Sequence, residues 1–190
     1  MNYPITFEDV LPVKDFIFLQ DELKLWSHDN GSSHDEEDQS KKFFGQPHRH
    51  DRIQFYNAAT IVLLKIKKKL KQDLKLVRIH SNAKLFGTLP EFHIDVNESD
   101  KCWTFVLFTS MQWNTNWGGE FVCQDPLTKE YKYTPYIPNN GVLIPGHWEH
   151  SGTAPLTIAA GLRKSIAFLF TPQDNYQKFI ENYPQSILFS

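Results

Sequence analysis

The sequence predicts a mainly β domain with flanking helices, in which a sandwich or jelly roll forms the core. Two observations predict this class. From residue 76 onward, short segments rich in β-branched and aromatic residues alternate with Pro, Gly, Asn and Asp. Before residue 76, apolar residues recur at the spacing of a helix face. Many short strands after a helical start are typical of a jelly roll with helices packed outside it.

Length and composition favour one domain with a substantial core. The chain has 190 residues, of which 41% are hydrophobic and 14% aromatic. A domain of this size buries roughly 70% of the surface that its unfolded chain exposes. We expect a single domain with helical support at 1–75, a core at 76–170 and a short C-terminal helix at 171–190.

Charge and cysteine content exclude several classes of protein. A net charge of -2 gives no reason to expect nucleic-acid binding. The two cysteines, Cys102 and Cys123, are too few for a disulfide scaffold and are expected to be free thiols, with a single disulfide bridge as the alternative. The N-terminus lacks a signal-peptide pattern, and no apolar stretch reaches about 18 residues. We therefore expect a cytoplasmic protein without a membrane partner, either a monomer or a homodimer.

Two helices are expected before the strands. An apolar stripe within residues 9–26 predicts a first helix, which should begin near Val13 because Pro12 interrupts the pattern. A second stripe predicts a helix from about Arg52 to Leu74. Its lysines alternate with the apolar stripe, which indicates a solvated face more than a nucleic-acid surface. Both helices should cover one face of the sheet that follows.

An acidic segment without periodicity lies between these helices, at residues 27–40. Its composition predicts a loop. A metal site built from its histidines, His28 and His34, is the weaker interpretation, and His48 and His50 are likewise expected on the surface. The loop is also a hypothetical lid over a substrate site.

The strands are followed by a short helix. Thr171 is expected to be its N-cap, with Pro172 at the first helical position and Tyr183 near its end. The expected strands are Leu76–His80, Trp103–Ser110, Gly119–Cys123, Tyr131–Tyr136, Gly141–Ile144, Thr157–Ala160 and Leu162–Phe170.

The segment around His93 and Asp95 carries the chemistry. In an extended chain, residues two apart project from the same face, so these side chains can reach one point while Ile94 turns into the core. Two His and one carboxylate on one side of a metal form the facial triad of non-haem Fe(II) enzymes. A second His is available after the apolar run Gly141–Ile144, at His147 or His150.

These elements resemble the Fe(II)/2-oxoglutarate oxygenases, in particular the prolyl-4-hydroxylase-like branch that includes compact phage and bacterial enzymes. The resemblance covers residues 76–170 well and the N-terminal part loosely. It implies a double-stranded β-helix, which is a jelly roll. The segments that carry it are Arg78–Asn82, His93–Asp95, Trp103–Phe108, Trp117–Phe121, Pro145–His150 and Arg163–Ser165.

The resemblance implies an iron site and its catalytic ligands. His93, Asp95 and His150 are the expected metal ligands, and His150 is preferred over His147 because it lies five residues past Pro145, as the family's ligand does. The implied cofactor is Fe(II), with 2-oxoglutarate and O2 as co-substrates and ascorbate as an accessory reductant. A carboxylate at position 95 implies hydroxylation in place of halogenation.

The resemblance also implies a site for 2-oxoglutarate. Arg163 should bind its C5 carboxylate through a planar guanidinium, and Ser165 should face the same way. Asn82 is a further candidate, with a simple turn at this position as the equal alternative. The family's Tyr is replaced by Phe108, so Thr104, Ser165 or another donor must supply the missing hydroxyl.

The substrate is less defined than the chemistry. The resemblance implies hydroxylation of a C–H bond, with a prolyl residue of a peptide or protein as the first expectation. A free amino acid or other small molecule is the alternative within enzymes. A non-catalytic metal-binding jelly roll, acting as a sensor or binding protein, is the alternative of another class. For a phage-encoded protein, the expected location is the host cytoplasm.

Overall fold

The computed structural model describes residues 3–23, 44–47 and 53–183. Its strands are β1 (Ile5–Phe7), β2 (Phe44–Pro47), β3 (Leu74–Lys84), β4 (Trp103–Phe108), β5 (Phe121–Gln124), β6 (Tyr131–Thr134), β7 (Gly141–Pro145), β8 (His150–Gly152) and β9 (Arg163–Pro172). Its helices are α1 (Val13–Glu22), α2 (Ile53–Leu70) and α3 (Tyr176–Asn182), with short 3-10 helices at Glu98–Asp100, Thr115–Trp117, Ile158–Ala160 and Gln173–Asn175.

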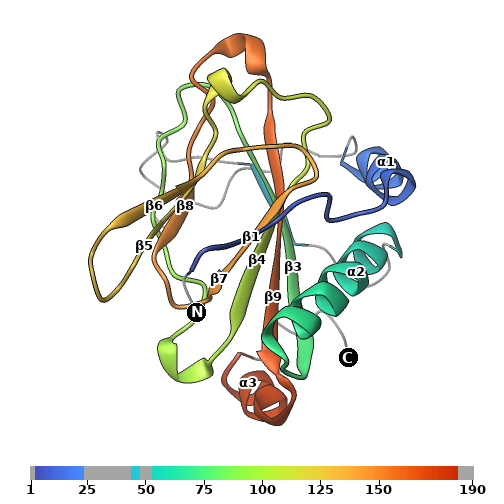
Figure 1. The fold of residues 1–190 in the computed structure, drawn as a ribbon, viewed down its shortest axis with the longest axis vertical. Helices are drawn as coiled ribbons and strands as arrows, with labels where there is room; N and C mark the ends of the chain where they lie inside the picture. The colour runs from blue at the N-terminus through green and yellow to red at the C-terminus, as the bar shows by residue number, and fades with distance from the viewer. Residues whose placement is uncertain (1–2, 24–43, 48–52, 184–190) are drawn as a thin grey trace.

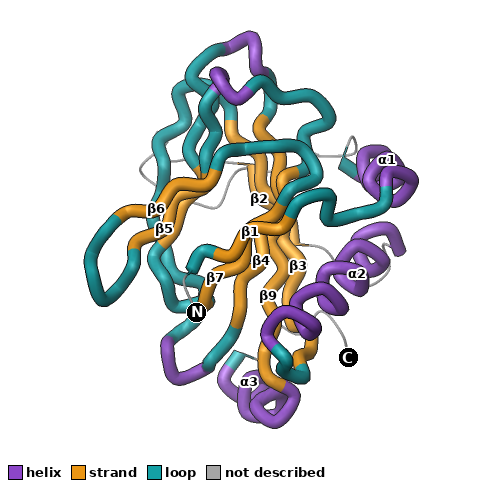
Figure 2. Tube along the Cα trace, in the orientation of Figure 1, coloured by secondary structure: helices purple, strands orange, loops and turns teal. Residues whose placement is uncertain are grey.

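Two antiparallel sheets form the body of the molecule. The larger has six strands in the order β1-β7-β4-β9-β3-β2, and the smaller has three in the order β6-β5-β8. Figures 1 and 2 show the small sheet to the left of the large one, with α1 and α2 on the opposite side. Strands that are distant in sequence are neighbours in both sheets, as in a jelly roll. This confirms the predicted fold class.

Alternation along the central strands builds two separate apolar layers. On β4, Phe105 and Leu107 join the cluster beneath the helices, whereas Val106 and Phe108 join a second cluster between the two sheets. Successive side chains of a strand leave opposite faces, so one strand supplies both layers. The large sheet is therefore buried on both sides at its centre.

The helices cover the outer face of the large sheet, as predicted. Buried residues of α1 and α2, such as Leu19 and Ile66, pack in one cluster with Phe168 of β9. The start of α1 at Val13 is confirmed. The predicted end of the second helix was wrong, because Lys71 adopts a left-handed conformation with φ of 54° and Leu74 already belongs to β3.

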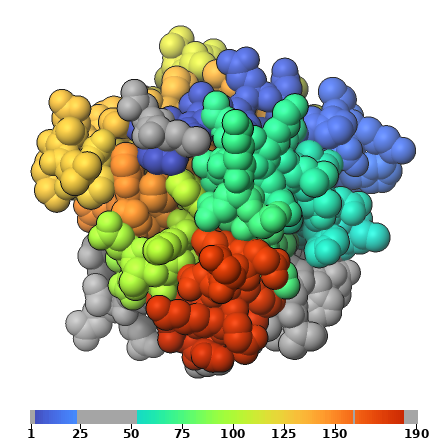
Figure 3. All heavy atoms as spheres, turned by 60° about the horizontal axis from the view of Figure 1, so that its bottom comes forward, coloured from blue at the N-terminus to red at the C-terminus, as the bar shows by residue number. Residues whose placement is uncertain are grey.

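The predicted start of the C-terminal helix was also wrong. Thr171 is fully buried within β9 and caps no helix, and α3 begins only at Tyr176 after a 3-10 turn. Hydrogen bonds from Asn175 and Tyr183 to Asp100 join α3 to the Glu98–Asp100 turn. In Figure 3 the red residues of α3 accordingly lie beside the lime-coloured turn, below the green end of α2.

Most predicted strands are present, with shifted ends. The segment 157–160 was predicted as a strand, but it contains the 3-10 helix Ile158–Ala160. Strands β1, β2 and β8 were not predicted, since each has only three or four residues. The predictions for the loop 27–40 and for His28, His34, His48 and His50 fall outside the described residues.

The state of the cysteines agrees with a further expectation. Cys102 and Cys123 are both buried free thiols. Among the described residues, no helix has the length and apolar character needed to cross a membrane.

Candidate metal and co-substrate site

A direct backbone pairing brings the two candidate histidine ligands together. His93 and His150 form an isolated antiparallel bridge, in which each backbone N–H donates to the other's carbonyl at 3.1 and 2.9 Å. The centroids of their rings are 4.6 Å apart. Residues paired in this way project to the same side, so both imidazoles face one space.

Asp95 completes a compact set of three possible ligands. Its carboxylate and one ring nitrogen each of His93 and His150 all lie within 4.8 Å of one another. The backbone N–H of Asp95 donates to Gly146 O at 2.9 Å, which fixes the segment beside the end of β7. The structure therefore brings the predicted ligand set together at one point.

Hydrogen bonds orient both imidazoles. The Nδ1 atom of His93 lies 3.2 Å from Glu91 O, and that of His150 lies 2.8 Å from Trp148 O. A carbonyl only accepts, so each Nδ1 carries the proton and each Nε2 keeps its lone pair. Such second contacts hold metal-binding histidines in the correct tautomer.

The carboxylate of Asp95 is held from behind. Arg78 of β3 donates to Oδ1, and the hydroxyl of Thr104 donates to Oδ2 at 2.5 Å. Burial alone would raise the pKa of Asp95, but the charge of Arg78 and the hydrogen bond from Thr104 oppose it, and the pKa lies below its usual value. Asp95 is therefore ionised at neutral pH and suited to a cation.

His150 is neutral when no ligand is bound. Its side chain is buried, and this burial lowers its pKa, against the opposing effect of Asp95. A metal ligand must present a lone pair, so a neutral imidazole is the competent form. In contrast, His147 lies away from the set, with its Nε2 3.9 Å from Glu98 Oε1.

The guanidinium of Arg163 lies at the other end of the same pocket. It is 2% exposed, its Nε donates to Gly119 O at 2.7 Å, and its Nη1 donates to Ser165 Oγ at 3.2 Å. Its Nη2 is buried without a hydrogen-bond partner in the described structure. An unpaired buried donor on a charged group is costly, so this atom indicates the place of an anionic ligand.

Two glycines make room for this guanidinium. A Cβ at Gly152 would lie 2.9 Å from Cζ and Nη1 of Arg163. Gly119 has a φ of +82°, and its carbonyl receives the Arg163 Nε–H. Gly119 thus also positions Arg163.

An aromatic layer supports Arg163. The buried ring of Tyr136 lies 4.8 Å from the guanidinium carbon and stacks on Phe108. Its hydroxyl donates to Lys164 O and accepts from the backbone N–H of Ser110 at 2.7 Å. Tyr136, which the sequence did not indicate, therefore supplies an aromatic platform but directs its hydroxyl at the backbone.

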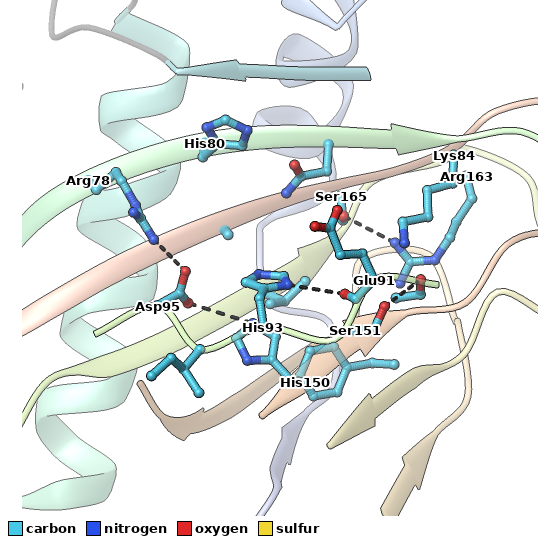
Figure 4. Close-up of a pocket in the computed structure, with 16 residues that line it drawn as sticks. Arg78, His80, Lys84, Glu91, His93, Asp95, His150, Ser151, Arg163 and Ser165 are labelled. Carbon is cyan, nitrogen blue, oxygen red and sulfur yellow. Dashed lines mark hydrogen bonds and ion pairs between the residues drawn. The ribbon is translucent and has the colours of Figure 1, made fainter. Parts of the chain in front are cut away.

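The pocket opens between the two sheets and has a volume of about 440 Å³. Figure 4 shows Arg78 and Asp95 at one end and Lys84 and Arg163 at the other. The remaining lining residues come from both sheets and from the His93 segment: His80, Asn82, Glu91, His93, Ile94, Val106, Phe121, His150, Ser151, Gly152, Ser165 and Ala167. Its size suits a small ligand that reaches from the histidines to Arg163.

The other predicted co-substrate residues differ in position. Asn82 and Ser165 are opposite each other on β3 and β9 and both line the pocket. Asn82 lies within β3, so the alternative of a turn at this position was wrong. Thr104 faces Leu169, four residues along β9 from Ser165, and this separation is roughly 13 Å along a strand. Its hydroxyl therefore serves Asp95 and not the Arg163 end.

Two side-chain orientations differ from those predicted. Ile94 is 50% exposed at the pocket and does not enter the core, because the His93 segment pairs only through its single bridge and runs along the pocket's edge. Lys164 points away from Arg163, as expected, but it is half-buried and its ammonium lies 3.4 Å from Leu23 O.

Sequence reasoning named Asn82 on β3 but missed the other residues of this strand that line the pocket. Arg78, His80, Asn82 and Lys84 all line the pocket. Their spacing of two residues was a visible signal, because alternate residues of a strand share one face. The roles of Arg78 and Lys84 depend on which strand lies beside β3, and one sequence does not contain that pairing.

No protein-family model matches the sequence, and no curated protein matches it either. Several solved structures match its fold. A prolyl-4-hydroxylase from Pseudomonas putida has a TM-score of 0.68 and 15% identity, over 90% of this chain and 92% of that one. A prolyl hydroxylase from Trichoplax adhaerens, solved with a peptide fragment of hypoxia inducible factor, has a TM-score of 0.69 and 13% identity, over 94% and 87%.

A third match is HygX from Streptomyces hygroscopicus with nickel and 2-oxoglutarate bound, at a TM-score of 0.68 and 12% identity over 90% of this chain and 83% of that one. The chain thus has the double-stranded β-helix fold of 2-oxoglutarate and Fe(II) oxygenases. Within that class, prolyl hydroxylases share the fold over most of both chains.

Proposed function

We propose that this protein is an Fe(II)- and 2-oxoglutarate-dependent dioxygenase that hydroxylates a C–H bond. One observation carries the proposal: a three-ligand set and a buried arginine with an unpaired nitrogen line the same pocket. A protein that only binds a metal would not need the buried arginine. The shared fold supports the same conclusion.

The donor set fits iron. His93 and His150 offer Nε2 lone pairs, and Asp95 offers an ionised carboxylate, which together make a two-His, one-carboxylate site with its remaining side toward the pocket. Arg78 and Thr104 hold Asp95 so that it can bind through a fixed oxygen. Iron held by these residues would supply open coordination positions and the redox chemistry that activates O2.

The opposite end of the pocket fits the distal carboxylate of 2-oxoglutarate. Arg163 is fixed by Gly119 and Ser165 and keeps Nη2 available for a charge-assisted hydrogen bond. Ser165 Oγ accepts from Arg163, so its own O–H is left to donate to the same carboxylate. The 2-oxo acid end then lies toward the histidines.

The overall reaction is balanced without a protein base. One atom of O2 enters succinate as 2-oxoglutarate loses CO2, and the other enters the substrate as a hydroxyl group. The role of the chain is to orient both organic molecules and to limit access of water. The buried Val106 and Phe121 contribute apolar walls to this pocket.

We further propose a prolyl residue of a peptide or protein as the substrate. The exposed apolar side chain of Ile94 lines the pocket, and the exposed Phe92, in the same segment, packs against Tyr131 with ring centroids 5.7 Å apart. Exposed aromatic and aliphatic groups beside a pocket suit a flanking chain more than a small polar metabolite. Two structures with this fold are prolyl hydroxylases.

Succinate formation tests the proposal. Purified protein with Fe(II), 2-oxoglutarate, ascorbate and proline-containing peptides should form succinate and a product heavier by one oxygen atom. His150→Ala should abolish both, whereas His147→Ala, three residues away and outside the ligand set, should retain them. Turnover of free proline alone would replace the peptide substrate with a small molecule. Metal binding without succinate under any condition would favour the sensor or binding protein.

A further inference from the structure

Three aromatic side chains gather on the outer face of the small sheet. Tyr131 and Tyr133 of β6 are two residues apart, so they project to the same side, and they are 49% and 66% exposed. Phe92, which is 36% exposed, packs edge-on against the ring of Tyr131. Together these three residues form the outer aromatic face. Figure 1 shows β5 and β6 at the left edge of the molecule, away from α1 and α2.

The outer aromatic face lies on the side of the small sheet that is turned away from the pocket. Phe121 of β5 lines the pocket and joins the cluster between the two sheets. Its neighbour Val122 therefore points outward, and Val122 is the register partner of Tyr133. The rings of Tyr131 and Tyr133 thus serve neither the pocket nor the core between the sheets.

The His93 segment connects this face with the pocket. Phe92 directly precedes the candidate ligand His93, and Ile94, which is 50% exposed, lines the pocket. The backbone bridge between His93 and His150 holds the segment beside β8, which pairs with β5. A chain that lies on the outer aromatic face can therefore continue past Phe92 and Ile94 to the pocket.

Exposed carboxylates lie next to the outer aromatic face. Glu130 directly precedes Tyr131, and its side chain is exposed. Glu149 is exposed as well, and its carbonyl accepts a hydrogen bond from the backbone N–H of Gln124, the register partner of Tyr131. These two acidic side chains therefore lie at the same end of the small sheet as Tyr131.

The cations of the same hairpin do not balance these carboxylates. Lys132 lies between the two tyrosines in sequence but turns to the inner side, where its ammonium donates to Asp125 Oδ2 at 3.0 Å and lies 5.5 Å from the ring centre of Trp148. The other cation of the hairpin 121–134 is Lys129, in the turn before β6. The charge around the tyrosines is therefore mainly negative.

Aromatic rings beside carboxylates suit the side chains of lysine and arginine. A cation over the face of an aromatic ring is attracted by the ring quadrupole, and the aliphatic part of a lysine or arginine side chain packs on the same ring. The carboxylates attract the same cations and repel acidic chains. This combination favours a basic segment over a neutral or an acidic one.

We propose that the outer aromatic face binds a lysine- or arginine-rich segment of a protein substrate, next to the residue that enters the pocket. The proposal rests on the proposed function for the partner's role as substrate, whereas binding of the basic segment itself needs no iron. The face thus determines which protein is chosen, separately from the groups that bind metal and co-substrate.

Three labelled peptides test this surface on metal-free protein. Each has a central proline, and the flanking residues are lysine, glutamine or glutamate; fluorescence anisotropy gives the Kd. The lysine peptide should bind most tightly, and its Kd should rise with salt concentration. Tyr133→Ser should raise this Kd about fivefold, as expected for loss of one cation–aromatic contact. Glu149→Gln should raise it about twofold to fivefold.

Matched variants on the helices serve as controls. Tyr56 of α2 is 48% exposed and Glu181 of α3 is exposed, and neither contributes to the outer aromatic face. Tyr56→Ser and Glu181→Gln should leave the Kd of the lysine peptide unchanged. Equal binding of the three peptides, or equal Kd values in Tyr133→Ser and Tyr56→Ser, would overturn the proposal. A homodimer that Tyr133→Ser dissociates would also overturn it, because a second copy of the chain would then occupy this face.

A turnover arm separates this surface from the proposed function. With Fe(II) and 2-oxoglutarate, Tyr133→Ser should raise the KM for the lysine peptide about fivefold and leave kcat and the Kd for 2-oxoglutarate unchanged. If the lysine peptide binds this face but no succinate forms, the oxygenase assignment fails and the surface remains. If succinate forms equally with all three peptides and Tyr133→Ser leaves KM unchanged, the surface is wrong and the oxygenase assignment remains.

Discussion

The side chains of the three candidate metal ligands are held in position by hydrogen bonds to groups outside the ligand set. His93 and His150 each use Nδ1 on a backbone carbonyl two residues earlier, and Asp95 is held by Arg78 and Thr104. These contacts select tautomer, ionisation state and direction before any ligand binds. Gly152 contributes by having no side chain, which leaves space for the guanidinium of Arg163.

Replacing Gly152 with alanine should separate co-substrate binding from stability. The added methyl group would meet Cζ and Nη1 of Arg163 at 2.9 Å, and the movable end of a long side chain can shift away. We expect the Kd for 2-oxoglutarate to rise about tenfold, for loss of one charged hydrogen bond, with little change in melting temperature.

Anaerobic titration calorimetry, first with Fe(II) and then with 2-oxoglutarate, measures the Kd of each ligand. Thr153→Ala is the matched control, because its hydroxyl bonds to Glu120 and it does not line the pocket. Equal 2-oxoglutarate affinity in Gly152→Ala and the unchanged protein would contradict the role given to this space.

The pKa of Lys84 predicts how co-substrate affinity depends on pH. Lys84 lines the pocket end that holds Arg163, and burial and then the charge of Arg163 lower its pKa to about 8, against an opposite effect from Glu91. It therefore carries its charge below this pH and loses it above. The Kd for glutarate in metal-free protein should therefore increase as pH rises through 8 and beyond. Lys84→Gln should show a weaker affinity that stays flat in this range. A parallel rise in both proteins would assign the effect to another group.

At the scale of elements, the adjacent strands β3 and β9 form one wall of the pocket. On β9, Arg163, Ser165 and Ala167 face the pocket, whereas Ile166 and Phe168 face the helices. This alternation was visible in the sequence, so the direction of Arg163 and Ser165 was predicted correctly. The same alternation on β3 does not by itself show which face lines the pocket. That depends on the pairing with β9, which joins residues about 80 to 100 positions apart in the sequence.

Short elements were the least predictable. Strand β8 has three residues, and His150 is the first of them. A run that short has no period to detect, and it becomes a strand only because β5 lies beside it. The left-handed Lys71 that ends α2 and the buried Thr171 at the end of β9 were missed for a similar reason, since local preference does not include tertiary packing.

The packing of α2 gives a stability prediction. Ile66 is fully buried in the cluster under the helices, whereas Leu64 of the same helix is 64% exposed. Ile66→Ala should lower the free energy of unfolding by about 2–5 kcal/mol, and Leu64→Ala should change it by less than about 0.5 kcal/mol. Chemical denaturation measures both. Similar losses in the two variants would contradict the placement of α2 on the sheet.

At the scale of the molecule, the pocket lies between the two sheets, and the helices cover the outer face of the large sheet. The class of this architecture followed from many short strands after two helices. The strand order did not, because a jelly roll pairs strands that are distant in sequence. The proximity of His93, Asp95 and His150 was predictable from the His93–Asp95 pattern and its resemblance, while the position of Thr104 behind Asp95 required the register of β4 and β9.

The two cysteines report on the integrity of this architecture. Burial raises the pKa of Cys102 to about 12 and that of Cys123 to about 11, so neither thiol is a reactive thiolate at neutral pH. Both should resist an aromatic disulfide reagent in the folded protein and react fully in denaturant. Rapid reaction of either thiol without denaturant would contradict the burial of the sheet interior.

The central claim is that His93, Asp95 and His150 bind iron in the same pocket in which Arg163 binds 2-oxoglutarate. Its most direct test is the visible charge-transfer band of the iron and 2-oxoglutarate chelate under anaerobic conditions. The band should appear in the unchanged protein, disappear in His150→Ala and require much more 2-oxoglutarate in Arg163→Ala. Protein that binds Fe(II) but shows no band at saturating 2-oxoglutarate would contradict the account.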